Sequence, residues 1–339
     1  MFAHLFEKKA RFAIYAIMAA ILLVAVLVCF CCGRLPLQPH EVFSAFVAKL
    51  TSQPIDHNTD LVIFSLRMPR IVLSLFVGAG LACAGAAYQS LFSNPLATPD
   101  TLGVSGGAAV GAVVGLLLDL PMPLVQLVAF VTGALATGMT IVVARVQGEI
   151  TITRLILAGV IVTSLMNAVI SIVKLVADPA DQLPEITYWL MGGLTGATRF
   201  NLVYGVIGIG IGIVGIFLLR WRLNVLSLGE EEARSSGTPV THLRVAIICF
   251  ATLISATVVA LCGQVGWVGL VIPHCARLVC GTNNRSVVPV SILLGALFML
   301  VVDTFARSAL AMEIPLSILT AFIGAPVFIV LLRKSGRHA

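Results

Sequence analysis

The side chains that could do chemistry are few and scattered in this chain. His274 follows Pro273 in an apolar stretch, and Asp178 and Asp181 flank Pro179. A lone histidine and a pair of carboxylates around a proline supply neither a nucleophile with its base nor a metal-ligand set. The G-x-x-x-x-G-K-[ST] motif that cradles ATP phosphates is missing from the sequence. We therefore expect a protein that is not an enzyme and binds no cofactor itself.

A stripe of polar side chains is the first candidate for a binding surface. Thr163, Asn167, Ser171 and Lys174 recur at helical spacing within the apolar stretch Leu155–Lys174. Polar groups on one face of a membrane helix should face protein or water rather than lipid. They would serve either as hydrogen-bonding contacts between helices or as the lining of an aqueous path. For a path, the candidates are Thr163, Asn167 and Ser171.

A second candidate is the broken segment YQSLFSNPLATPD, which runs from Tyr88 to Asp100. It combines Gln89 and Asn94 with two prolines. Irregular backbone at membrane depth is tolerated only where it is buried in protein or lines a cavity. Gln89 and Asn94 are therefore candidate gate residues, and an ordinary turn between two helices is the alternative.

The third candidate is a polar island, Arg220–Arg244, which carries seven of the 36 charged residues of the chain. Acidic residues at positions 230–232 favour a helix N-terminus, and Gly237 followed by Pro239 would end that helix. A short capped helix between two membrane spans would suit a docking surface for a soluble partner. A solvated loop with one helical turn is the alternative.

Composition places these candidates in a membrane. Hydrophobic residues make up 59% of the chain, charged residues 11%, and the mean hydropathy is +1.06. Soluble domains have about 45–50% apolar and about 25% charged residues. The net charge of +6 is not gathered in a basic, aromatic-rich patch, so we expect no nucleic-acid partner. The eight cysteines lie mostly in apolar stretches and are interpreted as packing residues.

The fold class expected is an all-α polytopic membrane protein. A spanning helix needs about 20 apolar residues. Nine uncharged stretches meet or approach this length, and Val245–Ala276 is too long for one helix, so we divide it near Gly263–Gly266. That gives about ten spans, with Ile186–Thr198 as an interfacial or re-entrant helix. The stretches are Phe12–Gly33, Ile71–Pro99, Thr101–Leu118, Leu120–Ala144, Leu155–Val173, Phe200–Leu219, Val245–Ala276, Ser286–Val302 and Ile314–Leu332.

An even number of spans places both termini on one side of the membrane. With the N-terminus in the cytoplasm, 14 lysines and arginines lie inside and 7 lie outside, as the positive-inside rule requires. The island Arg220–Arg244 is then cytoplasmic. The segment Arg34–Arg70 is an extracytoplasmic loop whose LPLQPHEVFSAF stretch predicts a short helix.

Small residues at every fourth position predict close helix packing. They form three stripes in separate apolar stretches. The stripes are Gly103, Gly107, Gly111 and Gly115; Gly78, Ala82, Ala86 and Ser90; and Gly208 and Gly212.

Several stretches together resemble the FecCD-type permease family, the membrane subunits of ATP-binding-cassette importers for iron-siderophores, haem and cobalamin. They are LRMPRIVLSLFVGAGLACAGAAYQSLFSNPLATPDTLGVSGGAAVG, LNVLSLGEEEARSSG, GLVIPHCARLV and IGAPVFIVLLRK, in the order of the family and over essentially the whole chain. Ser236 is a small departure, because many relatives carry leucine there.

The resemblance implies a single permease domain, 1–339, with ten spans in the inner membrane and a homodimeric assembly. It also implies two cytoplasmic ATPase subunits, which would hold the ATP and Mg²⁺, and an extracytoplasmic substrate-binding protein. The segment 220–244 would couple to the ATPase through Leu228, Gly229, Glu230, Glu231, Glu232, Ala233 and Arg234. By the same resemblance, Arg67, Arg70 and Arg307 would dock the binding protein.

The cargo implied by the resemblance is a metal chelate, with ferric siderophore ahead of haem and cobalamin. An oxyanion such as molybdate, carried by the same architecture, is the alternative within the family. An ion-coupled secondary transporter would need an ionisable group near the middle of a span, and no carboxylate occupies such a position. Dependence of uptake on a separate ATPase would distinguish these classes.

Overall fold

The protein is described by a computed structural model that covers residues 2–147, 149–228, 230–235, 237, 239–310 and 312–335. Helices dominate, and the strands form one two-stranded antiparallel hairpin. The elements are α1 (Phe2–Cys31), α2 (Pro39–Leu50), α3 (His57–Asp60), the π-helical η1 (Leu61–Arg67), α4 (Met68–Leu91), the 3-10 helix η2 (Pro99–Leu102), α5 (Val104–Leu117), α6 (Met122–Ala144), β1 (Arg145–Val146), β2 (Glu149–Ile150), α7 (Ile152–Val176), α8 (Gln182–Leu190), α9 (Arg199–Leu219), α10 (Arg222–Leu226), α11 (Glu230–Ser235), α12 (Val240–Cys262), α13 (Val268–Cys280), α14 (Asn284–Ser308) and α15 (Leu316–Ser335).

Ten apolar helices account for the predicted spans in the described part of the chain. Seven are long and apolar enough to cross a membrane, and the shorter apolar helices are Val104–Leu117, Val268–Cys280 and Leu316–Val330. The long stretch 245–276 is divided as predicted. α12 ends at Cys262, and Gly263 follows with a φ of +68°, a conformation that glycine adopts at little cost.

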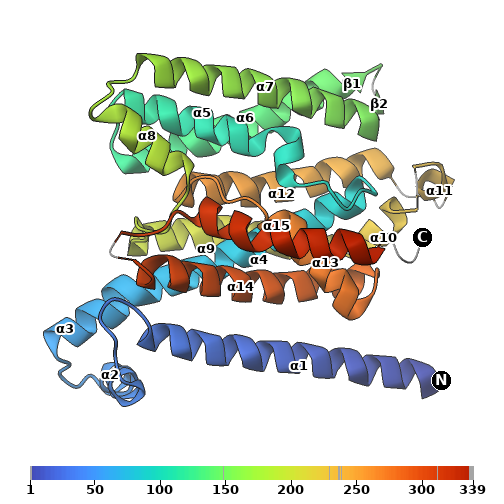
Figure 1. Ribbon diagram of the computed structural model, residues 1–339. Coiled ribbons are helices and arrows are strands. Elements are labelled where there is room, and N and C mark those ends of the chain that lie inside the picture. The colour runs from blue at the N-terminus through green and yellow to red at the C-terminus, as the bar shows by residue number, and fades with distance from the viewer. Residues whose placement is uncertain are drawn as a thin grey trace.

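The two ends of the bundle carry different short elements (Figure 1). α1 starts and α15 finishes at one end of the bundle, and the β1–β2 hairpin, α10 and α11 lie at that same end. α2, α3 and α8 lie at the opposite end. We call the first end inner and the second outer, following the charge distribution of the sequence. The polar island therefore shares an end with both termini, as predicted for the cytoplasmic face.

The outer segment 34–70 contains more helix than the sequence indicated. α2 forms where predicted, and its start is capped because the Glu41 carboxylate accepts a hydrogen bond from the Gln38 backbone N–H at 2.7 Å. From His57 onward the chain is helical without interruption to Leu91. The loop proper is therefore shorter than expected, and Arg67 and Arg70 stand on a helix.

Helix α4 occupies the middle of the bundle and packs against α9, α12, α13 and α14. Its small residues allow this. A Cβ on Gly78 would clash with the Gly295 carbonyl of α14, and a Cβ on Gly85 would clash with the Gly269 carbonyl of α13. Backbone therefore touches backbone along α4, which confirms the close packing predicted from its stripe of small residues.

The same device joins α5 to α6. A Cβ on Gly107 would meet Ala136, and one on Gly111 would meet the Thr132 side chain. α5 has only 14 residues, or about 21 Å at 1.5 Å per residue, less than a roughly 30 Å hydrocarbon core. The segment 92–103, which contains the 3-10 helix η2, precedes α5 on the inner side.

Candidate functional site

The polar island is anchored to the bundle by apolar side chains of α10 and α11. Leu223, Leu226 and Ala233 are all buried in the main core cluster. Leu228, between the two short helices, is 65% exposed, and Glu232 is also exposed. The structure therefore has a short helix here, one of the two alternatives left open by the sequence, and its use as a docking surface stays a prediction.

Part of the predicted coupling set lies outside the described structure. Gly229 is outside the described residues, and so are the side chains of Glu230, Glu231 and Arg234, although the backbone of all three belongs to α11.

Asparagines connect the island to the ends of two bundle helices. The Asn224 amide of α10 donates to Asn283 Oδ1 at 2.9 Å, and Asn224 Oδ1 accepts from the Asn284 backbone N–H at 2.8 Å. Asn284 Oδ1 in turn accepts from the Ser90 hydroxyl at 2.8 Å. Asn284 and Ser90 are buried, so the bond between them is shielded from water, whereas the Asn224–Asn283 bond is exposed. Motion of α10 would therefore reach the N-terminus of α14 and the inner end of α4.

Next to Ser90, Gln89 joins α4 to α13. Its amide donates to the Leu270 carbonyl at 3.0 Å, and its Oε1 accepts a hydrogen bond from the Arg277 guanidinium. Gln89 is buried. Asn94, the other gate candidate, instead closes the turn, because its Oδ1 accepts from the Leu96 backbone N–H at 2.9 Å. The two residues thus do different work: Gln89 spans two helices, and Asn94 shapes a turn.

The three predicted docking arginines lie together near the outer ends of α4 and α14. A Cβ on Gly33 would contact both Arg67 and Arg307, and Arg70 and Arg307 share the neighbour Asp303. Arg67 is 5% exposed and Arg307 9%. Arg67 donates to the Phe30 and Leu35 carbonyls, and Arg307 donates to the Cys29 carbonyl at 2.7 Å. These two side chains hold the end of α1 and the chain that follows it.

Arg70 binds two carboxylates at once. Its Nε and Nη2 lie 3.0 and 2.8 Å from Asp303 Oδ1, and its Nη1 and Nη2 lie 2.9 and 3.0 Å from the two oxygens of Glu313. The Asp303 side chain is 1% exposed, whereas that of Glu313 is 21% exposed. Asp303 is thus the buried partner, and Glu313, on the segment before α15, is the accessible one.

The predicted path residues lie on α7, at the edge of the bundle. Asn167 and Ser171 are exposed, whereas Thr163 is partly covered and lies against Gly103. The Ser171 hydroxyl donates to the Asn167 carbonyl at 2.9 Å. Because Asn167 and Ser171 face outward, they cannot serve as contacts between helices of one subunit. A surface shared with another subunit, or water, remains for them.

Several residues of these networks escaped the sequence analysis. Asn224, Asn283 and Asn284 are ordinary loop and cap residues by type, and nothing in their spacing links them. Asp303 gave the one usable signal, since a carboxylate within an apolar helix needs a partner. The described residues contain no group of three or more His, Cys, Asp or Glu side chains that could hold a metal ion.

Comparison with known proteins places this architecture in a family. Permease subunits named for different cargoes are similar to the chain: the molybdate import system permease MolB of Haemophilus influenzae is 37% identical over 90% of both chains. The cobalamin import system permease BtuC of Halobacterium salinarum is 38% identical over 82% of this chain and 75% of its own length. A solved structure, described as an inward-facing conformation of a provisionally assigned metal-chelate type ABC transporter, superposes with a TM-score of 0.86 at 34% identity, covering 95% of this chain and 99% of the other.

The match of a family profile extends over nearly the whole chain, from residue 21 to residue 334. That range includes the second half of the α1 span, the other nine apolar helices apart from the last residue of α15, and the inner projection formed by α10 and α11. This protein therefore belongs to the FecCD transport family and is a multi-pass inner-membrane permease subunit of an ATP-binding-cassette importer.

Proposed function

We propose that this permease subunit carries a metal chelate, with ferric siderophore as the first candidate cargo and haem or cobalamin as the others. The observation that carries the proposal is the chemistry of the exposed face of α7. Asn167 and Ser171 offer an amide and a hydroxyl there. Neutral polar groups suit a large chelate that has its own polar rim, because they solvate it without holding it tightly. Kinship with a cobalamin permease also supports a bulky cargo.

Molybdate is the second candidate, and kinship with MolB favours it. A small oxyanion would be expected to meet cations or backbone N–H groups along its path. Within α7 the basic residues are Arg154 and Lys174, and both stand near the helix ends. The middle of this face is uncharged, which is the physical reason to rank the chelate first.

We further propose a homodimer in which α7 and α15 of the two subunits face a shared path. Most of α7 is exposed, and α15 presents Phe322 at 77% and Ile329 at 53% exposure. Exposed apolar side chains alone are compatible with contact to lipid. The exposed amide of Asn167 on α7 is not compatible with lipid, and water between two facing subunits would satisfy its hydrogen bonds.

The ATPase partner is proposed to act on the exposed side of α10 and α11. Leu228 and the backbone of Glu230–Ser235 form the projection that would enter a cleft of the ATPase. The Asn224–Asn284–Ser90 bonds would carry its displacement to α4, and Gln89 would pass that displacement to α13. A two-position arrangement of α4 and α13 could then open or close the inner end of the path.

The binding protein is proposed to dock at the outer end, over Arg67, Arg70 and Arg307. Since the first and last of these are buried, Arg70 is the member closest to solvent. A carboxylate of the binding protein could reach it only by replacing Glu313. In this arrangement Glu313 acts as an internal stand-in for the acidic partner.

The test is reconstitution of the permease in proteoliposomes with its cognate ATPase and binding protein. Uptake of a radiolabelled ferric siderophore, haem, cyanocobalamin and molybdate is measured with and without ATP. ATP-dependent uptake of one chelate supports the proposal. Uptake of molybdate alone would establish the second candidate, and uptake driven by an ion gradient without the ATPase would establish a secondary transporter.

A further inference from the structure

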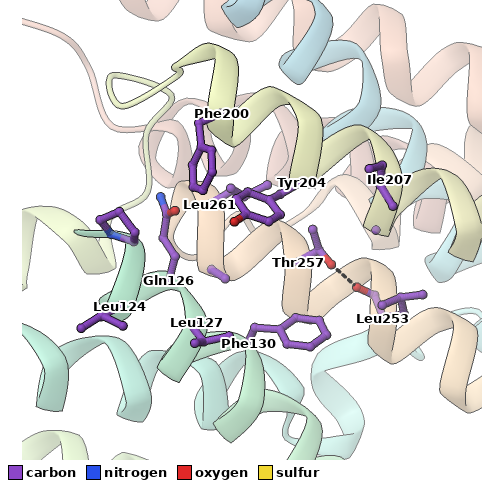
Figure 2. Close-up of a pocket in the computed structure, with 13 residues that line it drawn as sticks. Leu124, Gln126, Leu127, Phe130, Phe200, Tyr204, Ile207, Leu253, Thr257 and Leu261 are labelled. Carbon is purple, nitrogen blue, oxygen red and sulfur yellow. Dashed lines mark hydrogen bonds between the residues drawn. The ribbon is translucent and has the colours of Figure 1, made fainter. Parts of the chain in front are cut away.

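A groove opens between α6, α9 and α12 in the outer half of the bundle, away from the networks described above (Figure 2). Its volume is about 520 Å³. α12 forms the floor, and the exposed sides of α6 and α9 form the walls. The lining residues used below are Gln126, Leu127 and Phe130 of α6, Phe200, Tyr204 and Ile207 of α9, and Leu253 and Thr257 of α12.

The lining changes from amphipathic to apolar along the groove. Gln126 stands one turn from the start of α6, and Phe200 stands at the start of α9, both at the outer mouth. Tyr204 packs edge-on against Phe200 with ring centroids 4.4 Å apart. Farther in, Ile207 and Leu253 supply hydrocarbon.

The polar atoms follow the same order. The inner Thr257 hydroxyl already donates to the Leu253 carbonyl at 2.6 Å (Figure 2). Among the described residues, by contrast, the Gln126 amide and the Tyr204 hydroxyl at the mouth have no hydrogen-bond partner. Free polar groups therefore occur only at the outer end of this lining.

The length of the groove fits one leaflet of a bilayer. From Phe200 to Gly208 the wall of α9 advances eight residues, about 12 Å at 1.5 Å per residue. The hydrocarbon core is roughly 30 Å thick, so the groove ends before the midplane. A chain that enters from the outer leaflet would lie along it with its polar end at the mouth.

An arginine directly precedes the mouth residue Phe200 in the sequence. This residue, Arg199, is the first of α9 and is exposed. The described residues give it no carboxylate partner. Arginine binds phosphate oxygens with its planar fork of N–H donors, and tyrosine and other amphipathic rings settle at the headgroup level of membranes.

We propose that this groove is a binding site for one phospholipid of the outer leaflet, with an acyl chain along α12 and the headgroup phosphate at Arg199. The apolar floor argues against a polar chelate, whose hydrogen-bonding groups would lose water there without gaining partners. The cation at the mouth favours an anionic phospholipid over a zwitterionic one. The site is independent of the proposed cargo.

The first test compares two tryptophan substitutions on α9. Ile207 and Val203 are 55% and 56% exposed, but only Ile207 lines the groove. Native mass spectrometry of the detergent-purified protein, titrated with a phosphatidylglycerol of defined chains, reports bound lipid per subunit. Ile207→Trp should lower the affinity for the lipid about tenfold or more, because the indole ring would occupy the space of the acyl chain. Val203→Trp should bind as wild type does.

The opposite wall repeats the comparison if Ile207→Trp fails to fold. Leu127→Trp fills the groove from α6, and Leu135→Trp, on the same helix but outside the lining, is its control. Arg199→Gln should remove the preference for phosphatidylglycerol over phosphatidylcholine and leave phosphatidylcholine binding unchanged.

Two results would overturn the proposal. One is equal lipid binding by wild type, both groove-filling variants and both controls, which describes a non-specific lipid shell. The other is efficient disulfide cross-linking between two copies of a Leu127→Cys variant whose native cysteines have been removed. That result would assign the groove to a second copy of the chain.

Discussion

Arg70 and Asp303 form a two-point ion pair across 233 positions of sequence, with Arg70 Nη2 2.8 Å from Asp303 Oδ1 and Arg70 Nε 3.0 Å from the same oxygen. The pair ties the outer part of α4 to the outer part of α14. A buried carboxylate left without its partner is strongly destabilising, whereas an exposed pair contributes little. The outer end of the bundle is therefore held by an ion pair, and removing either partner alone should destabilise the fold.

We predict that Asp303→Asn lowers the free energy of unfolding by about 1–3 kcal/mol, because Arg70 loses its buried partner and keeps only the partly exposed Glu313 as a counter-charge. The matched control is Asp60→Asn, which breaks the exposed Lys49–Asp60 pair at 2.6 Å and should cost no more than about 1 kcal/mol. Equilibrium unfolding in mixed micelles measures both. Equal small effects of the two substitutions would show that the Arg70 pair does not hold this end.

Glu313→Gln is predicted to strengthen docking of the binding protein. The substitution removes the accessible carboxylate that competes for Arg70, while Asp303 keeps the guanidinium in place. Affinity for the reconstituted permease should rise at low salt, and the gain should shrink near 1 M salt, where the Debye length is about 3 Å. Glu185→Gln, another exposed outer carboxylate, is the control. A weaker or unchanged affinity for Glu313→Gln would remove Arg70 from the docking contact.

Uncoupling is predicted for two kinds of change at the inner end. Opposite charges at Glu231 and Arg234 should disturb the contact with the ATPase, and Asn224→Ala should cut the hydrogen bonds from α10 to α14. Both variants should still fold and assemble, and ATP hydrolysis should continue with less transport per ATP. The measurement is the ratio of uptake to hydrolysis in proteoliposomes. A wild-type ratio for Asn224→Ala would mean that displacement reaches α4 by another route.

The path along α7 can be mapped with two cysteines. In a background without native cysteines, Asn167→Cys should react with a small aqueous thiol reagent in at least one nucleotide state. The control is Ile172→Cys. Ile172 is also exposed, at 60%, but it lies on another side of α7. A cysteine there should face lipid and stay unreactive. Protection of Asn167→Cys in every state would contradict an aqueous path at this face.

Gln89→Ala is predicted to slow ATP-dependent uptake, because the Arg277 guanidinium loses the bond that joins α13 to α4 while remaining largely enclosed. Asn94→Ala removes only a turn contact and should leave the rate within about twofold, as expected for a hydrogen bond worth roughly 0.5 kcal/mol. The rates are compared at saturating binding protein. Equal rates in wild type and Gln89→Ala would return Gln89 to a purely packing role.

The helices could be predicted well from the sequence because a membrane span requires a long stretch without charged residues. The division of 245–276 at Gly263 and the close packing along Gly78 and Gly107 also followed from local residue types. The helical extension from α4 back to His57 did not follow from local residue types, because the polar residues before Leu61 are typical of a loop.

The candidate site was predicted less completely. Arg67, Arg70 and Arg307 were expected together and are found together, but the burial of Arg67 and Arg307 was not expected. Backbone carbonyls of Phe30, Leu35 and Cys29 accept the hydrogen bonds of these two buried side chains, and a backbone acceptor leaves no mark in the sequence. Likewise, Asn224 and Ser90 are linked through Asn284 only because α10 packs beside α4 and the start of α14, a long-range placement that no local pattern encodes.

The contact of α4 with α14 has a mechanical consequence. Where Gly78 faces Gly295, the two backbones meet directly, and the side chains of Ala82 and Met299 stand beside the contact. Neither glycine has room for an added methyl group, so backbone atoms rather than side-chain rotamers set the spacing of the two helices here. Repacking of side chains elsewhere in the bundle therefore cannot bring α4 and α14 closer together at this point.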